Sequence, residues 1–120
     1  MKLGTVLTVR KENLIDAATA LVGGGPAYIS YFAQALIEYA LLAGFDEANA
    51  YSMVIQTLRG TSALLDGHQE SPARLYEKVM TPKGTTEQAI NFFDSKKMQA
   101  IVIDGLKHAN ARSRALGRRP

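Results

Sequence analysis

The stretch that decides the fold is PAYISYFAQALIEYALLA, residues 26 to 43. Its strongly polar members are Ser30, Gln34 and Glu38, and a spacing of four residues places them in one narrow stripe along a helix. A chain of 120 residues has little material of its own with which to enclose so apolar a helix. We therefore expect a second subunit to cover it. A membrane span is disfavoured, because the segment is short and contains Gln34 and Glu38.

On both sides of this segment the chain is also predicted to be helical. Gly23 to Gly25 end a preceding helix, Asp46 and Ser71 suit helix N-caps, and Gly67 and Gly117 suit helix ends. The β-branched stretch from residue 4 to 10 is too short to form a sheet and is read as an amino-terminal arm. The fold class is thus all-α, with about six helices. One domain over 11–117 is expected between an arm (1–10) and a basic tail (118–120), with helices at 11–21, 26–43, 47–65, 72–79, from 85 onward, and 97–116.

Composition excludes several kinds of chemistry. Hydrophobic residues make up 47% and charged residues 21%, which is typical of a folded domain. The absence of cysteine excludes disulfides, thiolate zinc sites, iron–sulfur clusters and cysteine nucleophiles. His68 and His108 have no other ligand at metal-binding spacing, so no metal site is expected. The first ten residues lack a secretory signal, which favours a cytoplasmic location.

The positive charge lies at the carboxyl end. The net charge is +3, yet residues 107 to 120 alone carry five basic and no acidic residues, so the rest of the chain has a net charge of −2. A basic end without interleaved aromatic residues is a weak signature of nucleic-acid binding. Binding through Arg112 to Arg119 is therefore kept only as an alternative, and no membrane partner is expected.

The loop from Thr81 to Thr86 is a candidate anion site. Unpaired amides at the start of a helix attract negative charge, and the hydroxyls of Thr81, Thr85 and Thr86 add donors. The sequence from Thr85 to Gln88 fits a capping box, in which Thr85 accepts from the third amide and Gln88 reaches back. Spacing alone favours neither a carboxylate site nor simple helix capping.

No catalytic residues are expected. The chain offers neither a paired acid and base nor a nucleophile with its activator. Gly23 to Gly25 lack the G-x-G-x-x-G pattern of a dinucleotide-binding turn, and a break between two helices is the simpler interpretation. Glycine still allows another chain or a ligand to approach the backbone there.

Several segments in register resemble a known family. They resemble the C-terminal dimerisation domain of pyrroline-5-carboxylate reductase, the last enzyme of proline synthesis. The segments that carry the resemblance are Leu14 to Ala17, Ala20-Leu21, GGGPAY at 23–28, Gln56-Thr57, Gly60, TPKGTT at 81–86 and RSRALG at 112–117.

The resemblance implies an interleaved helical bundle that pairs with itself, similar to the C-terminal domain of 6-phosphogluconate dehydrogenase. Residues 11–117 would then supply dimerisation and substrate binding, and dimers could assemble further into rings. The family reduces 1-pyrroline-5-carboxylate to proline with hydride from NADPH or NADH. The cofactor is held by an amino-terminal Rossmann domain, so this chain alone is expected to hold no cofactor and to be inactive. The alternative is a stand-alone oligomerisation module without catalysis.

The resemblance also implies roles for individual residues. Three positions depart from it: Val22 and Gly24 stand where serines are common, and Lys83 replaces a common glycine. The resemblance places the substrate carboxylate at Thr81, Gly84, Thr85 and Thr86, with Val79 lining the pocket, and the cofactor near Gly24, Gly25 and Pro26.

Overall fold

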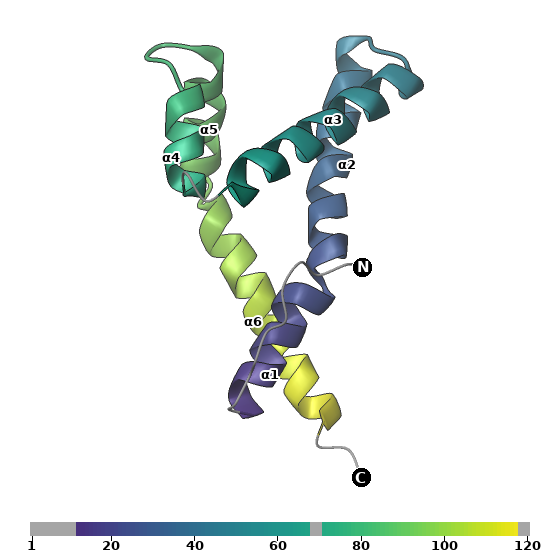
Figure 1. Cartoon of the computed structure of the whole chain (residues 1–120), viewed down its shortest axis with the longest axis vertical. Helices are drawn as coiled ribbons and strands as arrows, with labels where there is room; N and C mark the ends of the chain where they lie inside the picture. The colour runs from purple at the N-terminus through teal and green to yellow at the C-terminus, as the bar shows by residue number, and fades with distance from the viewer. Residues whose placement is uncertain (1–11, 68–70, 118–120) are drawn as a thin grey trace. The chain divides into compact units, whose positions relative to one another are not determined.

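The structure is a computed structural model that describes residues 12–67 and 71–117. The expected arm and tail and His68 lie outside these residues. Within them the fold is all-α, as expected, and contains no strand. The elements are α1 (Glu12–Ala18), the π-helix η1 (Thr19–Gly23), α2 (Gly25–Ala43), α3 (Glu47–Asp66), α4 (Pro72–Val79), α5 (Thr85–Ser95) and α6 (Met98–Gly117), shown in Figure 1.

The helix boundaries lie close to the expected ones because local capping chemistry sets them. The Asp46 carboxylate accepts from the Asn49 amide at 2.7 Å, and the Ser71 hydroxyl accepts from the Arg74 amide at 3.2 Å. The element count differs in one place: the first expected helix is split, because its last turn, Thr19–Gly23, is a wider π-helix.

The turn after α2 is a Schellman motif centred on Gly44. The Gly44 amide donates to the Leu41 carbonyl, and the Phe45 amide donates to the Ala40 carbonyl, both at 3.1 Å. Gly44 has φ +112°, a conformation that residues with a side chain rarely adopt. This turn therefore fixes the end of α2.

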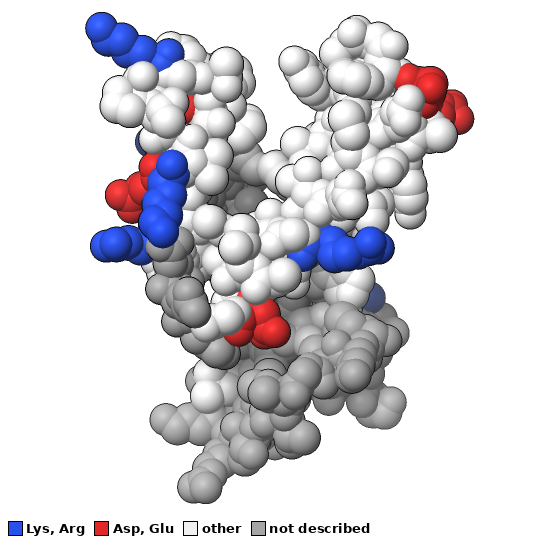
Figure 2. Space-filling model, turned by 45° about the horizontal axis from the view of Figure 1, so that its top comes forward, with Lys and Arg blue, Asp and Glu red and all other residues white. Residues whose placement is uncertain are grey.

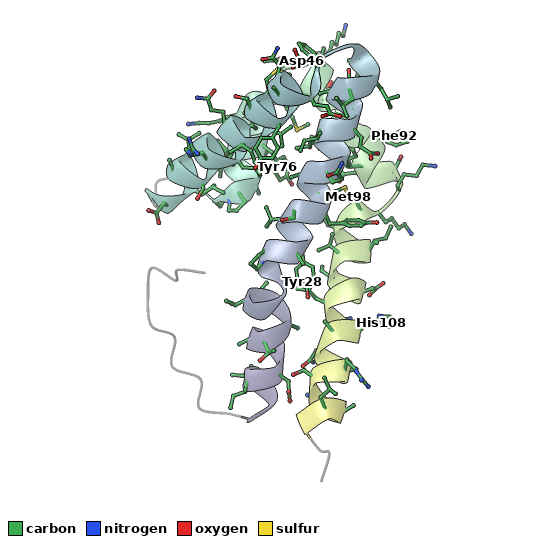
Figure 3. All side chains as sticks on the ribbon, turned by 90° about the vertical axis from the view of Figure 1, so that its right-hand side faces the viewer. Tyr28, Asp46, Tyr76, Phe92, Met98 and His108 are labelled. Carbon is green, nitrogen blue, oxygen red and sulfur yellow. The ribbon has the colours of Figure 1, made fainter. Side chains whose placement is uncertain are left out.

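The chain divides into two compact units. The terminal unit contains residues 1–28 and 99–120, and the central unit contains residues 29–98. In the terminal unit α1 lies beside α6 (Figures 1 and 3), and the Ser113 hydroxyl donates to the Asp16 carboxylate at 2.8 Å. This hydrogen bond joins residues 97 positions apart and ties the two ends of the described chain together.

The chain does not enclose α2. Its buried residues are only Ala33 and Ala40, whereas Tyr31, Tyr39 and Leu42 are 84%, 72% and 88% exposed. This agrees with the expectation that 120 residues cannot cover the helix by themselves; the second subunit that would cover it remains a prediction. Among the described residues, no helix combines the length and apolarity that crossing a bilayer requires.

Candidate functional site

The candidate anion site begins with a tight turn between α4 and α5. The Gly84 amide donates to the Thr81 carbonyl at 2.9 Å, closing a four-residue turn. Pro82 occupies the second position, and Lys83 at the third has φ +60°. These features define a type II turn, which normally favours glycine at the third position. The side chain of Lys83 is therefore carried on a left-handed backbone position.

Gly84 is tightly enclosed by Thr81. A Cβ atom at position 84 would meet the Thr81 hydroxyl and would lie 3.0 Å from the Thr81 carbonyl oxygen. The carbonyl belongs to the same turn and cannot move away freely. Glycine is thus required here for close packing.

The expected capping box is wrong in its details. The N-cap of α5 is Gly84 rather than Thr85, and Glu87 rather than Gln88 reaches back. The Glu87 carboxylate accepts from the Lys83 amide at 2.9 Å. The reason is the turn: it starts the helix directly after Gly84, which makes Thr85 the first helical residue and brings Glu87 to the third helical position.

This arrangement leaves several donors unused. Within the described chain, the amides of Thr85, Thr86 and Glu87 have no hydrogen-bond partner, and the hydroxyls of Thr81, Thr85 and Thr86 form no hydrogen bond. Because the macrodipole adds positive potential at this end of α5, the site can accept an anion. The ammonium group of Lys83 adds attraction, and the Glu87 carboxylate opposes it.

The structure brings all five expected substrate-binding residues into one short stretch of the central unit. Val79 is the last residue of α4 and is 56% exposed, Thr81 and Gly84 delimit the turn, and Thr85 and Thr86 begin α5. Sequence reasoning did not select Glu87. The signal that would have found it is a glutamate three residues after a glycine cap. The substrate role of this stretch remains a prediction.

The three expected cofactor-binding residues lie in the terminal unit, where η1 meets α2. Gly24 follows η1, and Gly25 and Pro26 begin α2. A Cβ atom at Gly25 would have no neighbour within 4 Å, whereas one at Gly24 would meet the ring of Tyr28. Pro26 carries no amide hydrogen. The backbone of Gly25 is therefore the open one of the three, and the cofactor role of this segment stays a prediction.

Two other kinds of site concern the histidines and the basic side chains. No group of three or more histidine, aspartate and glutamate side chains is placed to hold a metal ion, and the His108 ring contacts the Asp104 carbonyl of its own helix at 2.8 Å. On the face shown in Figure 2 the described basic side chains are scattered and form no continuous patch.

Comparisons with known proteins agree with this architecture. Residues 12–116 match the family model described as pyrroline-5-carboxylate reductase dimerisation. The chain is 35% identical to the pyrroline-5-carboxylate reductase of Synechocystis over 117 residues, which cover 98% of this chain and 43% of that protein.

Solved structures of such reductases are also similar. The enzyme from Coxiella burnetii has a TM-score of 0.85 with 34% identity, over 90% of this chain and 40% of that one. The NADP-bound enzyme from Plasmodium falciparum has a TM-score of 0.85 with 26% identity, over 90% and 41%. The chain thus spans about two fifths of the length of these relatives. On this evidence the chain belongs to the pyrroline-5-carboxylate reductase dimerisation family.

Proposed function

We propose that this chain supplies the self-association surface and the substrate-carboxylate site of an NAD(P)H-dependent pyrroline-5-carboxylate reductase. The observation that carries the proposal is the start of α5. There, three unpaired amides and three unbonded threonine hydroxyls coincide with the loop that the family resemblance assigns to the substrate.

The proposed role of these residues is to position the substrate. A carboxylate at the start of α5 accepts hydrogen bonds from the Thr85 and Thr86 amides and the Thr86 hydroxyl, which orients the ring and its C=N bond. Holding two reactants in a productive geometry lowers the barrier by several kcal/mol. The nicotinamide cofactor supplies the hydride when it is bound, and Gly25, whose backbone is open, is proposed to contact it. The reaction is proposed to take place in the cytoplasm.

Self-association is proposed through α2. Side chains as large as Tyr31, Tyr39 and Leu42 stay mostly exposed in the single chain, and each contributes about 1.5 to 3 kcal/mol when it is fully buried. A second copy would present the same side chains, so a symmetric contact can cover both helices. Assembly of such dimers into rings is part of the proposal.

Domain complementation tests the proposal. The purified chain is mixed with, or fused to, the amino-terminal cofactor domain of a relative, and NAD(P)H oxidation is followed with 1-pyrroline-5-carboxylate. We expect oxidation by the wild-type chain. Thr86→Ala should raise the KM for the substrate about tenfold, because a charge-assisted hydrogen bond is lost. The matched control is Thr61→Ala, whose hydroxyl donates to the Thr57 carbonyl within α3.

Two results would contradict the proposal. A self-associated, folded chain that restores no oxidation in any arrangement would favour the module without catalysis. Equal KM values for Thr86→Ala and Thr61→Ala would remove the carboxylate role of the α5 start even if oxidation is restored.

A further inference from the structure

Two side-chain hydroxyls form hydrogen bonds at the first two residues of the π-helix η1, Thr19 and Ala20. The Thr19 hydroxyl donates to the Ile15 carbonyl at 2.9 Å, and the Tyr28 hydroxyl donates to the Ala20 carbonyl at 2.7 Å. Ala20 is 6% exposed and is the buried residue of the described terminal unit. π-helical turns are rare, and a hydrogen bond from outside the turn's own ladder gives such a turn additional support. Tyr28 supplies that support from the first turn of α2 (Figure 3).

Tyr28 reaches Ala20 by passing over Gly24. A Cβ atom at position 24 would meet the Tyr28 hydroxyl and would lie 3.1 Å from the ring carbon Cε2. The Tyr28 amide also donates to the Gly24 carbonyl at 3.1 Å. Backbone and side chain of Tyr28 therefore enclose Gly24 together, and the hydrogen bond to Ala20 depends on the missing side chain.

The neighbouring glycine is different. Nothing lies within 4 Å of the place where a Cβ at Gly25 would be, so its backbone is open. Two adjacent glycines in one short segment thus have separate surroundings, one filled by the chain itself and one accessible from outside.

We propose that Tyr28 is a positioning residue for the η1–α2 junction. Position 24 is a glycine because its missing side chain leaves room for the Tyr28 ring, and not because it contacts the cofactor. Ala20 is the second residue of η1, so the hydrogen bond from Tyr28 ties the first turn of α2 to the body of η1 across the junction and thereby sets the orientation of the open Gly25 backbone. This inference rests on the proposed function only for the nature of what approaches Gly25, a nicotinamide dinucleotide.

Hydrogen–deuterium exchange on the full chain tests the positioning role. Tyr28→Phe keeps the ring and removes the hydroxyl, and it should raise the exchange rate of amides 20–25 roughly fivefold, as expected for losing one hydrogen bond. Amides of α3 should exchange at the wild-type rate. Tyr51→Phe is the matched control: it removes a phenolic hydroxyl from an exposed residue of α3. Unchanged exchange in Tyr28→Phe would overturn the proposal.

Double substitution tests the role of Gly24. Gly24→Ala should raise exchange of the same amides as much as Tyr28→Ala, and combining the two should add nothing, because both remove one interaction. Gly25→Ala should leave exchange at the wild-type level. Fully additive effects of Gly24→Ala and Tyr28→Ala on the exchange rates would show that the hydrogen bond of Tyr28 does not depend on a glycine at position 24.

Kinetics in the complemented enzyme separate positioning from general stability. Tyr28→Phe should raise the KM for NAD(P)H severalfold while kcat and the KM for 1-pyrroline-5-carboxylate stay unchanged. Similar changes in kcat and in both KM values would indicate a merely structural role and overturn the proposal. Because the exchange experiments need no cofactor domain, an inactive complemented enzyme with the expected exchange pattern would count against the proposed function alone.

Discussion

The starts of α2 and α5 are similar in their glycines and differ in their hydrogen bonding. Each helix begins directly after a glycine, and at each the space of the missing side chain is filled by a hydroxyl group of the same chain: Tyr28 at Gly24 and Thr81 at Gly84. At α5 the first amides and their threonine hydroxyls stay unpaired. At α2 the second residue is Pro26, which has no amide hydrogen, and the hydroxyl of Tyr28 is bonded to Ala20. A glycine before a helix therefore does not by itself indicate a ligand site; the two starts differ in whether the neighbouring hydroxyl is already bonded.

The largest expected effect comes from breaking the self-association that is proposed for α2. Tyr39→Asp places a charge on a 72% exposed position of α2. If a second copy covers this position, burying an unpaired charge and losing the apolar contact should weaken self-association by about two orders of magnitude. Analytical ultracentrifugation over a concentration series measures this. The matched control is Asn91→Asp, which adds the same negative charge at an exposed position of α5. Equal association constants for the two variants would refute the burial of α2.

Alanine substitution should lower the free energy of unfolding more at Gly84 than at Gly24. Gly84→Ala meets a backbone carbonyl at 3.0 Å and replaces a tolerated N-cap by a poor one, so it should lower the free energy of unfolding by about 2 to 3 kcal/mol. Gly24→Ala meets only the end of a tyrosine side chain that can rotate away, and about 1 kcal/mol is expected from the lost hydrogen bond. Urea denaturation of both variants measures the difference. A larger cost at Gly24 would reverse the comparison.

Glu87 tests the electrostatics of the α5 start. Glu87→Gln retains an oxygen that can accept from the Lys83 amide, so the turn should persist. Removal of the negative charge should tighten proline binding about threefold, and it should cost about 0.5 kcal/mol of helix stability through the macrodipole. Isothermal titration with proline in the complemented enzyme measures the first effect, and thermal unfolding measures the second. Weaker proline binding would mean that Glu87 itself contributes to the site.

Local chemistry explains which features the sequence could predict. Asp46 and Ser71 bond the amide three residues later, and such caps depend on no distant residue, so the starts of α3 and α4 agree with expectation. The unpaired amides at the start of α5 depend on the same local chemistry, whereas the substrate role of this loop stays a prediction. At Thr85 local propensity pointed to the wrong cap, because the left-handed Lys83 begins the helix one residue earlier than a threonine cap would.

Other features depend on interactions that a single sequence does not reveal. A π-helical turn shifts the register by one residue, which hydrophobic periodicity cannot detect in a segment as short as Thr19–Gly23. Some apolar side chains at helical spacing are exposed in the single chain: Leu64 is 62% and Ile101 is 63% exposed, whereas Ala50 and Val54 are buried. Periodicity marks such faces as apolar, but it does not say whether the same chain or a second one covers them.

The smallest expected effect concerns the positive charge of Lys83, which has a left-handed backbone conformation in the turn between α4 and α5. Lys83 and Lys97 both have positive φ, 60° and 56°, and both follow helices that end within a few residues. Replacing either by glycine relieves about 1 to 2 kcal/mol of left-handed strain but increases the entropy of the unfolded chain by about 0.4 to 1 kcal/mol. A net stabilisation of about 0.5 kcal/mol is expected at each, measured by thermal unfolding. Only Lys83 adjoins the unpaired amides of α5, so only Lys83→Gly should also weaken proline binding, about twofold, through the lost positive charge. Equal weakening by Lys97→Gly would mean that the charge of the whole chain, rather than the turn, attracts the ligand.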